Sequence, residues 1–171
     1  MRFSFQPATP DDAAPLAALH TAVAHHLTQL HGRGAWSSGT SEKGVLYAMR
    51  TSQVFAAREG PELVATLRLT TKKPWAIDIG YFAPCRKPLY LLAMAVAPAK
   101  QHQGIGRRCL EQAKLLATGW GMEAIRLDAF DAAAGAGGFY ARCGYTEVGR
   151  AAYRRTPLIY YQLLLTATGS S

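Results

Sequence analysis

The chain has 171 residues, 49% of them hydrophobic and 18% charged, with 19 Lys and Arg against 11 Asp and Glu. Such a length and composition predict one folded domain, residues 1–166, with a substantial core. A membrane span would need about 18 uninterrupted apolar residues, and the sequence has no such run. The first residues lack the apolar core of a signal peptide, so we expect a cytoplasmic protein. Residues 167–171 are expected to form a disordered tail.

The formal net charge of +8 would suit a nucleic-acid partner. The basic residues, however, are scattered in pairs, and no arginine-rich tail or basic stripe with interleaved aromatic residues occurs. A basic surface that attracts a polyanionic cofactor explains the charge equally well. We therefore expect neither a nucleic-acid nor a membrane partner.

The sequence shows no pattern typical of a metal site or a disulfide framework. Its cysteines, Cys85, Cys109 and Cys143, are odd in number and include no C-x-x-C pair. Four histidines lie between residues 20 and 31, but their spacing does not place them on one helix face beside a carboxylate or thiolate. No metal is expected.

The first half of the chain mixes helical and strand patterns. Alternating polar and apolar residues predict a strand at 2–6. Thr9 as N-cap and Pro10 at the first helical position begin a helix, and its apolar residues step by three and four to Leu30. After it we expect, in order, a flexible loop at 32–41, a helix from Ser41 to about Arg50, a hairpin of strands at 54–58 and 63–70, and an irregular insertion at 72–88.

The second half continues the alternation of strand and helix. An apolar run predicts a strand at 89–96, and apolar residues at helical spacing predict a helix from Ile105 to about Gly119. Further along we expect a strand at 125–130, a helix at 132–143 that three glycines weaken, and strands at 145–150 and 158–165. Together these elements predict an α/β (α+β) fold: a single mixed, mostly antiparallel central sheet of about seven strands, with helices on both faces.

A glycine loop joins the strand at 89–96 to the helix that follows it. The first N–H groups of a helix have no partner inside it and lie at its positive dipole end, and Gly104 and Gly106 let an anion approach the backbone closely. A P-loop is excluded because no Gly-Lys-Ser/Thr follows, and the strict G-x-G-x-x-G of a dinucleotide site is absent. A phosphate site and an ordinary turn both remain open at this point.

Two motifs resemble those of a known family. The string Val96-x-Pro98-x-x-Gln101-x-x-Gly104-Ile105-Gly106, which follows an apolar strand and opens a helix, resembles the acetyl-coenzyme A signature of the GNAT superfamily of N-acetyltransferases. The later string Phe139-Tyr140-x-x-x-Gly144-Tyr145 is similar to that family's second motif, in the same order and at a similar distance. The resemblance implies the GNAT fold, in which the central strands splay to admit the cofactor, and acetyl-coenzyme A as co-substrate.

The resemblance also implies how the cofactor is held. The pyrophosphate would lie on backbone amides of residues 102–107, and the pantetheine arm would follow the main chain of residues 94–96. The implied cofactor-binding residues are Met94, Ala95, Val96, Gln101, His102, Gln103, Gly104, Ile105, Gly106, Arg107 and Tyr140.

Two residues carry the chemistry that the resemblance implies. Tyr140 matches the tyrosine that donates a proton, or a hydrogen bond, to the coenzyme A sulfur. Asp128 occupies the strand position where some members carry a glutamate base, and Glu62 with an ordered water is the substitute. The sequence departs from the family at Ala133, where an asparagine is common, and Asp131 could replace that contact.

These residues predict an acetyl-coenzyme A dependent N-acetyltransferase in which an amine attacks directly in a ternary complex. An amine of lysine-like pKa is almost wholly protonated at pH 7, so a base or a neutralising pocket is needed. The acceptor would be a small-molecule or peptide amine, and the few acidic residues argue against a strongly cationic one. The alternative is a catalytically silent domain that binds or senses acyl-coenzyme A. A homodimer is left open.

Overall fold

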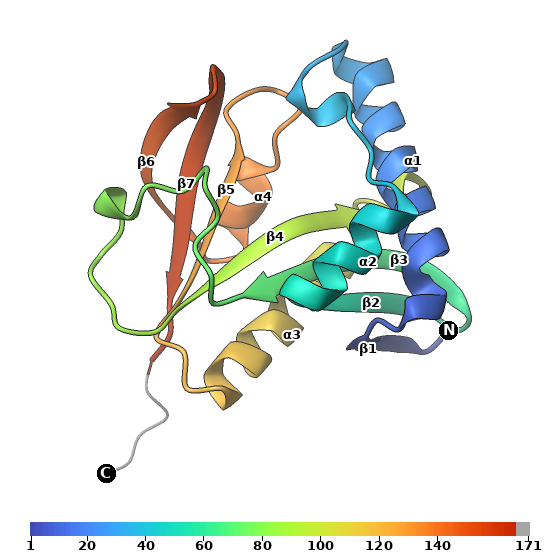
Figure 1. The fold of residues 1–171 in the computed structure, drawn as a ribbon, viewed down its shortest axis with the longest axis horizontal. Helices are drawn as coiled ribbons and strands as arrows, with labels where there is room; N and C mark the ends of the chain where they lie inside the picture. The colour runs from blue at the N-terminus through green and yellow to red at the C-terminus, as the bar shows by residue number, and fades with distance from the viewer. Residues whose placement is uncertain (167–171) are drawn as a thin grey trace. The chain divides into compact units, whose positions relative to one another are not determined.

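The computed structural model describes residues 1–166, and the expected disordered tail at 167–171 lies outside them. The strands form a seven-stranded mixed sheet in the order β1-β2-β3-β4-β5-β7-β6, flanked by helices, which confirms the predicted fold class (Figure 1). The chain divides into two compact units, which are described separately below: unit 1 holds Met1–Leu69 with Ala93–Gln112, and unit 2 holds Thr70–Leu92 with Ala113 onward. The expected single domain stays a prediction.

Three antiparallel strands form the sheet of unit 1. They are β1 (Phe3–Pro7), β2 (Gln53–Glu59) and β3 (Glu62–Thr70). β1 pairs with β2 from Phe3↔Glu59 to Pro7↔Phe55, and β2 pairs with β3 from Gln53↔Leu69 to Glu59↔Glu62. Gly60, in the turn between β2 and β3, has a φ of 56°, which a glycine adopts without strain. The predicted hairpin is confirmed.

Neighbouring residues of β2 show how helices cover both faces in unit 1. Val54 packs toward α1 (Ala13–His31) and α2 (Glu42–Thr51), in a core around Leu16 and Val45. Phe55 points to the opposite face, where its ring stacks on Phe5 at 5.0 Å. On that face the guanidinium of Arg108, at the start of α3 (Ile105–Gly119), lies 4.0 Å from the centre of the Phe3 ring.

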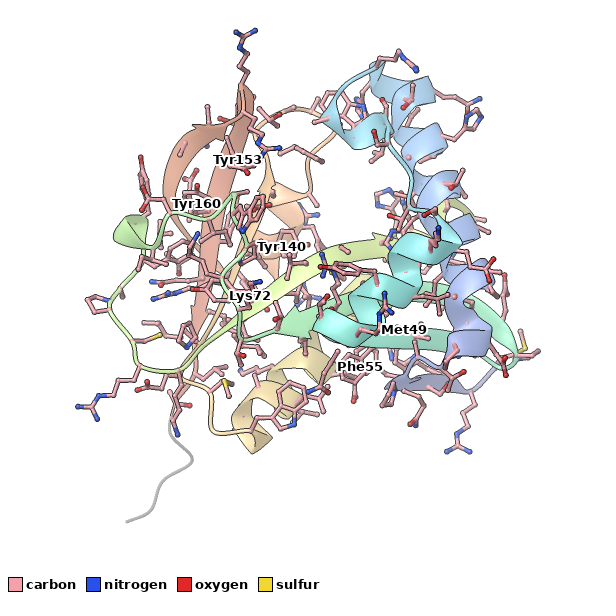
Figure 2. The ribbon with its side chains drawn as sticks, viewed as in Figure 1. Met49, Phe55, Lys72, Tyr140, Tyr153 and Tyr160 are labelled. Atoms are coloured by element: carbon pink, nitrogen blue, oxygen red, sulfur yellow. The ribbon has the colours of Figure 1, made fainter. Side chains whose placement is uncertain are left out.

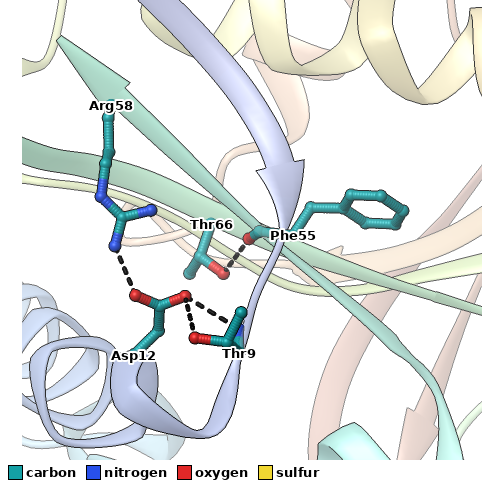
Figure 3. Close-up of polar contacts among 5 residues, drawn as sticks. All are labelled: Thr9, Asp12, Phe55, Arg58 and Thr66. Carbon is teal, nitrogen blue, oxygen red and sulfur yellow. Dashed lines mark hydrogen bonds and ion pairs between the residues drawn. The ribbon is translucent and has the colours of Figure 1, made fainter. Parts of the chain in front are cut away.

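The two N-terminal helices begin with different caps. Ser41 caps α2 as predicted, because its Oγ accepts a hydrogen bond from Gly44 N–H at 3.0 Å. Thr9 instead precedes a 3₁₀ turn, η1 (Pro10–Asp12), and α1 starts only at Ala13. There the Asp12 carboxylate accepts a hydrogen bond from Thr9 N–H at 2.8 Å and forms an ion pair with Arg58 (Figure 3). The acidic first turn is therefore anchored to strand β2.

The end of α1 and the connection after it differ from the expectation in two respects. Leu30, expected on the apolar face, is 63% exposed. The expected flexible loop at 32–41 contains a 3₁₀ turn, η2 (Ala35–Ser37). Trp36 Nε1 donates to the Gly32 carbonyl at 2.9 Å, and Thr28 Oγ1 donates to Ser37 Oγ at 2.7 Å. Local hydrogen bonds thus order part of this connection.

Unit 2 contains the other half of the sheet. The first residues of β4 (Pro88–Val96) pair in parallel with β5 (Ala124–Phe130), from Pro88↔Ala124 to Tyr90↔Arg126. β5 pairs along its whole length with β7 (Thr156–Leu164), which pairs antiparallel with β6 (Thr146–Tyr153). All the other pairings described here are antiparallel, so the sheet is mixed as predicted.

Residues 72–87, which we call the strap, cover one face of β7. Leu158 and Tyr160 of β7 pack there with Ile77 and Phe82. The Tyr160 hydroxyl donates to the Ala76 carbonyl at 2.6 Å and accepts from Asp78 N–H at 3.3 Å. The strap includes a 3₁₀ turn, η3 (Ile79–Tyr81). The expected irregular insertion is therefore a segment fixed to the sheet.

On the other face of β7, α4 (Gly137–Arg142) is shorter than the expected helix at 132–143. A Cβ on Gly135 would collide with the carbonyl oxygen of Phe130, at the end of β5. The chain therefore passes close to the strand end as a turn and becomes helical only at Gly137. No helix among residues 1–166 is both long and apolar enough to cross a bilayer.

The turn between β6 and β7 is unusually tight for its sequence. Arg154 and Arg155 have φ values of 47° and 68°, and Tyr153 pairs directly with Thr156. Such two-residue turns favour Asn-Gly, because both positions lie in the left-handed region. Two arginines occupy it here.

Candidate functional site

The glycine loop of unit 1 runs from the end of β4 at Val96 to the start of α3 at Ile105. A 3₁₀ turn, η4 (Pro98–Lys100), follows β4. His102 and Gly104 then have left-handed φ values of 63° and 83°. Gln101 Nε2 donates to the Val96 carbonyl at 3.1 Å, and Gln103 Nε2 donates to the Ala99 carbonyl at 3.2 Å. Both glutamine side chains therefore hold the loop in shape.

This loop meets the requirements of an anion site. Arg108 N–H donates to the Gly104 carbonyl at 3.1 Å, so the N–H groups just before it have no acceptor one helical turn earlier. A Cβ on Gly104 would meet no heavy atom within 4 Å, so the space beside the backbone is open. No acidic residue lies in the first turn of α3. A pyrophosphate fits these groups.

Basic side chains around the loop have different surroundings. Arg107 is exposed at the first turn of α3, whereas Arg108 lies over the Phe3 ring. Lys100 forms ion pairs with Glu59 at 3.2 Å and Glu62 at 3.6 Å. Glu62, the substitute base, thus has a lysine as its neighbour.

The end of β4 carries a backbone irregularity just before the residues expected to contact the pantetheine arm. Ala93 has a φ of 52°, which is rare for a residue with a Cβ, and its side chain is exposed. Ala95 is buried, whereas Met94 and Val96 are half-buried. This φ departs from the regular β conformation just before those residues.

Tyr140 lies in unit 2, on α4 (Figure 2). Its ring belongs to a cluster of aromatic rings. Its ring centre is 5.3 Å from that of Phe139, 5.8 Å from that of Tyr145 and 6.0 Å from that of Tyr161. Burial, with smaller contributions from the charges of Asp128 and Cys143, raises the pKa of Tyr140. The phenol therefore stays protonated and can donate a proton or a hydrogen bond.

Asp128 is also in unit 2, but on the other face of the β5–β7 ladder. It pairs directly with Tyr160, and directly paired residues share a face, whereas Tyr140 packs on Tyr161. The two expected catalytic side chains are thus placed on opposite faces. Desolvation by burial raises the pKa of Asp128, which makes its carboxylate a stronger base than an exposed one.

The expected replacement for the missing asparagine has another partner. The Asp131 carboxylate forms an ion pair with Arg150 at 3.2 Å, and Arg150 also binds Glu147 at 2.7 Å. Ala133 is exposed in the turn before α4.

An open hollow of about 660 Å³ lies in unit 2 between the strap and the β6–β7 hairpin. Its lining includes Lys73, Trp75, Ile79, Tyr81 and Tyr153, and the Trp75 side chain is 75% exposed. Figure 2 shows Tyr153 and Tyr160 on the hairpin strands that contribute to it. Sequence reasoning gave residues 72–88 as an irregular insertion and did not anticipate this hollow.

The described residues offer no cluster of metal ligands, and Cys109 is not an activated thiol. Among residues 1–166, no group of three or more His, Cys, Asp or Glu side chains could hold a metal ion. Cys109 is buried on α3, and burial raises the pKa of its thiol to about 12. It is therefore a poor nucleophile.

Sequence reasoning missed two arginines inside apolar strands. Arg126 of β5 is 4% exposed; its Nη2 donates to the Ala83 carbonyl at 2.9 Å, and its guanidinium lies 5.0 Å from the Phe82 ring centre. Arg68 of β3 is half-buried, between Leu67 and Leu69. A charged residue flanked by buried apolar ones is the signal that could have revealed both.

The sequence matches the family model described as the acetyltransferase (GNAT) family, over residues 21–145. No curated protein matches it.

Several solved structures share the fold at low sequence identity. A GNAT-family acetyltransferase from Listeria monocytogenes matches with a TM-score of 0.74 and 19% identity, over 95% of each chain. The protein yncA from Salmonella typhimurium, solved with its cofactor acetyl-CoA, matches with a TM-score of 0.68 and 18% identity, over 98% of this chain and 96% of that one. The ribosomal-protein-S18-alanine N-acetyltransferase from Escherichia coli matches with a TM-score of 0.69 and 19% identity, over 98% of this chain and 97% of that one.

Proposed function

The chain belongs to the GNAT acetyltransferase family, and from this premise we propose that it is an N-acetyltransferase that moves an acetyl group from acetyl-coenzyme A to an amine acceptor. The amine attacks directly in a ternary complex. The observation that carries the proposal is the family match over residues 21–145, supported by a loop that fits a pyrophosphate.

Backbone groups of unit 1 bind the cofactor in this proposal. The amides of His102 to Arg107 hold the pyrophosphate, and the main chain of Met94 to Val96 holds the pantetheine arm. The bound cofactor supplies an activated thioester. Gln101 and Gln103 orient the loop through their bonds to backbone carbonyls at 3.1 and 3.2 Å. Binding here relies on preformed geometry, so it needs little reorganisation.

Tyr140 supplies the proton for the departing thiolate in the proposed mechanism. A raised pKa keeps its phenol protonated throughout the neutral range, as a donor requires. The ring contacts with Phe139, Tyr145 and Tyr161 restrict its orientation. Tyr140 is thus held as a fixed donor rather than a mobile one.

Asp128 is the proposed base that accepts the proton of the amine. Its raised pKa brings the carboxyl group closer to the amine in basicity, so the proton transfer is less unfavourable than to an exposed aspartate. Glu62 is the weaker candidate, because its exposed carboxylate already forms an ion pair with Lys100 at 3.6 Å.

The test measures free thiol released from acetyl-coenzyme A with a panel of amines, amino acids, antibiotics and peptides, together with cofactor binding by calorimetry. Release that depends on an acceptor supports the proposal. Tight cofactor binding without release from any acceptor would contradict it and favour a silent acyl-coenzyme A binding domain.

A matched pair of variants tests the role of Tyr140. Tyr140→Phe should lower kcat about tenfold or more while leaving cofactor affinity unchanged, since it removes only the donor. Tyr145→Phe is the control, because its hydroxyl is also buried and its ring lies in the same cluster. Equal rates for the two variants would limit Tyr140 to a packing role.

A further inference from the structure

Arg68 points to the helix-covered face of unit 1. It pairs directly with Val54, and paired residues of an antiparallel ladder share a face. Val54 packs in the core that α1 and α2 form on that face. An electrostatic interaction between Arg68 and His20 of α1 places the guanidinium there independently. The cation therefore lies between the sheet and the helices.

The surroundings of Arg68 leave its charge uncompensated. Its guanidinium donates a long hydrogen bond of 3.4 Å to Ser52 Oγ, at the end of α2, and forms no ion pair with any residue between 1 and 166. Desolvation by burial lowers its pKa. Burial, and then the charge of Arg68, lower the pKa of His20, so that histidine is neutral near pH 7 and gives the arginine no negative partner.

Other partly buried cations of unit 1 behave differently. Arg58 is paired with Asp12, and Lys100 with Glu59 and Glu62. A desolvated cation without a carboxylate is costly, so a half-buried one that the chain retains is a candidate for binding an anionic ligand. Arg68 stands out from these two by the absence of an acidic partner.

The strand register brings Arg68 beside the proposed acetyl site. Ala97 N–H donates to the Val64 carbonyl at 2.8 Å, so the start of β3 lies next to the end of β4. Counting four residues along β3 and four back along β4 sets Arg68 beside Ala93, where the backbone of β4 has its left-handed φ. Residues 94–96, proposed to hold the pantetheine arm, follow directly.

We propose that Arg68, with Ser52 beside it, binds a carboxylate of the acceptor, so that the acceptor is an amino acid or another amine bearing a small carboxylate. The inference rests on the proposed function and names its substrate class. A guanidinium binds a carboxylate through two parallel N–H···O bonds, which would fix the acceptor's orientation as well as its charge.

The experiment compares L-amino acids with their own carboxamides as acceptors, by thiol release from acetyl-coenzyme A. The amines of the carboxamides are less basic, so a larger fraction of them is neutral and able to attack at neutral pH. A preference for the acids would therefore run against the intrinsic reactivity of the amines. For the wild type we expect the acids to show the higher kcat/KM. Arg68→Met should reduce kcat/KM for the acids about tenfold to a hundredfold and leave the carboxamides and the coenzyme A affinity unchanged.

Two further variants separate charge from folding. Arg68→Lys keeps the cation without the planar fork and should retain part of the preference. Arg58→Met removes a partly buried arginine elsewhere in unit 1, and should lower thermal stability without changing the ratio of acid to carboxamide rates. Circular dichroism confirms that each variant is folded before its rates are compared.

Binding of the products gives a readout that does not need turnover. N-acetyl amino acids should bind in the presence of coenzyme A, and N-acetyl amino-acid amides should bind at least tenfold more weakly. Equal binding or equal rates of acid and amide would overturn the carboxylate site while leaving the acetyltransferase intact. Weaker coenzyme A binding by the Arg68→Met variant would mean that the guanidinium binds the cofactor rather than the acceptor. Failure of thiol release with every acceptor would instead refute the proposed function, and the product titration would still decide the carboxylate site.

Discussion

Replacing Tyr160 by phenylalanine should loosen the strap and lower the stability of unit 2 by a measurable amount. The substitution keeps the ring, which is 2% exposed and packs 5.5 Å from the Phe82 ring centre, and removes only the hydroxyl. That hydroxyl donates to the Ala76 carbonyl at 2.6 Å and accepts from Asp78 N–H at 3.3 Å. Two backbone groups of the strap would lose their partner at once.

The expected magnitude follows from these two bonds. A neutral hydrogen bond contributes about 1 kcal/mol net, and the longer bond contributes less than the shorter, so we expect a loss of about 1–2 kcal/mol in the free energy of unfolding. For a chain of this size each kcal/mol shifts Tm by about 2–4 °C. The melting temperature should therefore fall by several degrees.

Urea unfolding followed by circular dichroism measures the loss, with Tyr161→Phe as the control. Tyr161 is the next residue of β7 and is similarly buried, but its hydroxyl forms no hydrogen bond with any of residues 1–166. We expect that control to change stability by less than about 0.5 kcal/mol. Equal losses in the two variants would refute the view that the Tyr160 hydroxyl holds the strap.

Three further substitutions test other parts of the molecule. Gly104→Val should weaken acetyl-coenzyme A binding in calorimetry and cost about 1–2 kcal/mol of stability, because a β-branched residue is strained at a φ of 83°. The control Gly119→Ala, in open space on α3, should leave affinity and stability unchanged. A normal affinity of the valine variant would contradict the anion site. Asp128→Asn should raise Tm at neutral pH while lowering turnover: burial raises the pKa of Asp128, so its favourable contribution is complete below the unfolded value near 3.8 and is lost as pH rises through the folded value. An unchanged Tm at pH 7.5 would argue against this desolvation. Asp12→Ala should destabilise the protein by about 1–2 kcal/mol in urea unfolding, because it removes the Arg58 ion pair and the Thr9 hydrogen bond. Burial alone would raise the pKa of Asp12, but the bonds from Thr9 and Arg58 outweigh burial and leave the pKa below 3.8. The destabilisation by Asp12→Ala should therefore disappear as pH falls through the folded-state pKa of Asp12.

Elements fixed by local interactions could be predicted from the sequence. Ser41 caps α2 through an amide three residues away, and the glycine loop has its shape from backbone torsions and short-range bonds of Gln101 and Gln103. Alternating residues on β2 and β3 identify the hairpin because each strand has one face toward a helix. Such features depend on neighbours within a few residues, which a sequence displays directly.

Features that depend on distant contacts could not be predicted in this way. The strap is held by Tyr160, 84 residues beyond Ala76 in sequence, so residues 72–87 show no periodicity of their own. The start of α4 is set by the close approach of Gly135 to the Phe130 carbonyl rather than by helix propensity. The importance of Arg68 follows from the acidic partner it lacks, and only the packed structure identifies which cations are paired.

Trypsin cleavage at the turn formed by Arg154 and Arg155 would report local opening of the β6–β7 hairpin. Trypsin cleaves after arginine, but a protease must draw several residues into an extended conformation, and a two-residue turn with left-handed φ values of 47° and 68° does not supply them. Cleavage there requires that β6 and β7 first separate at their tip. The rate of nicking at low trypsin concentration therefore reports the free energy of opening this hairpin, and a ligand seated in the hollow beside Tyr153 would slow it.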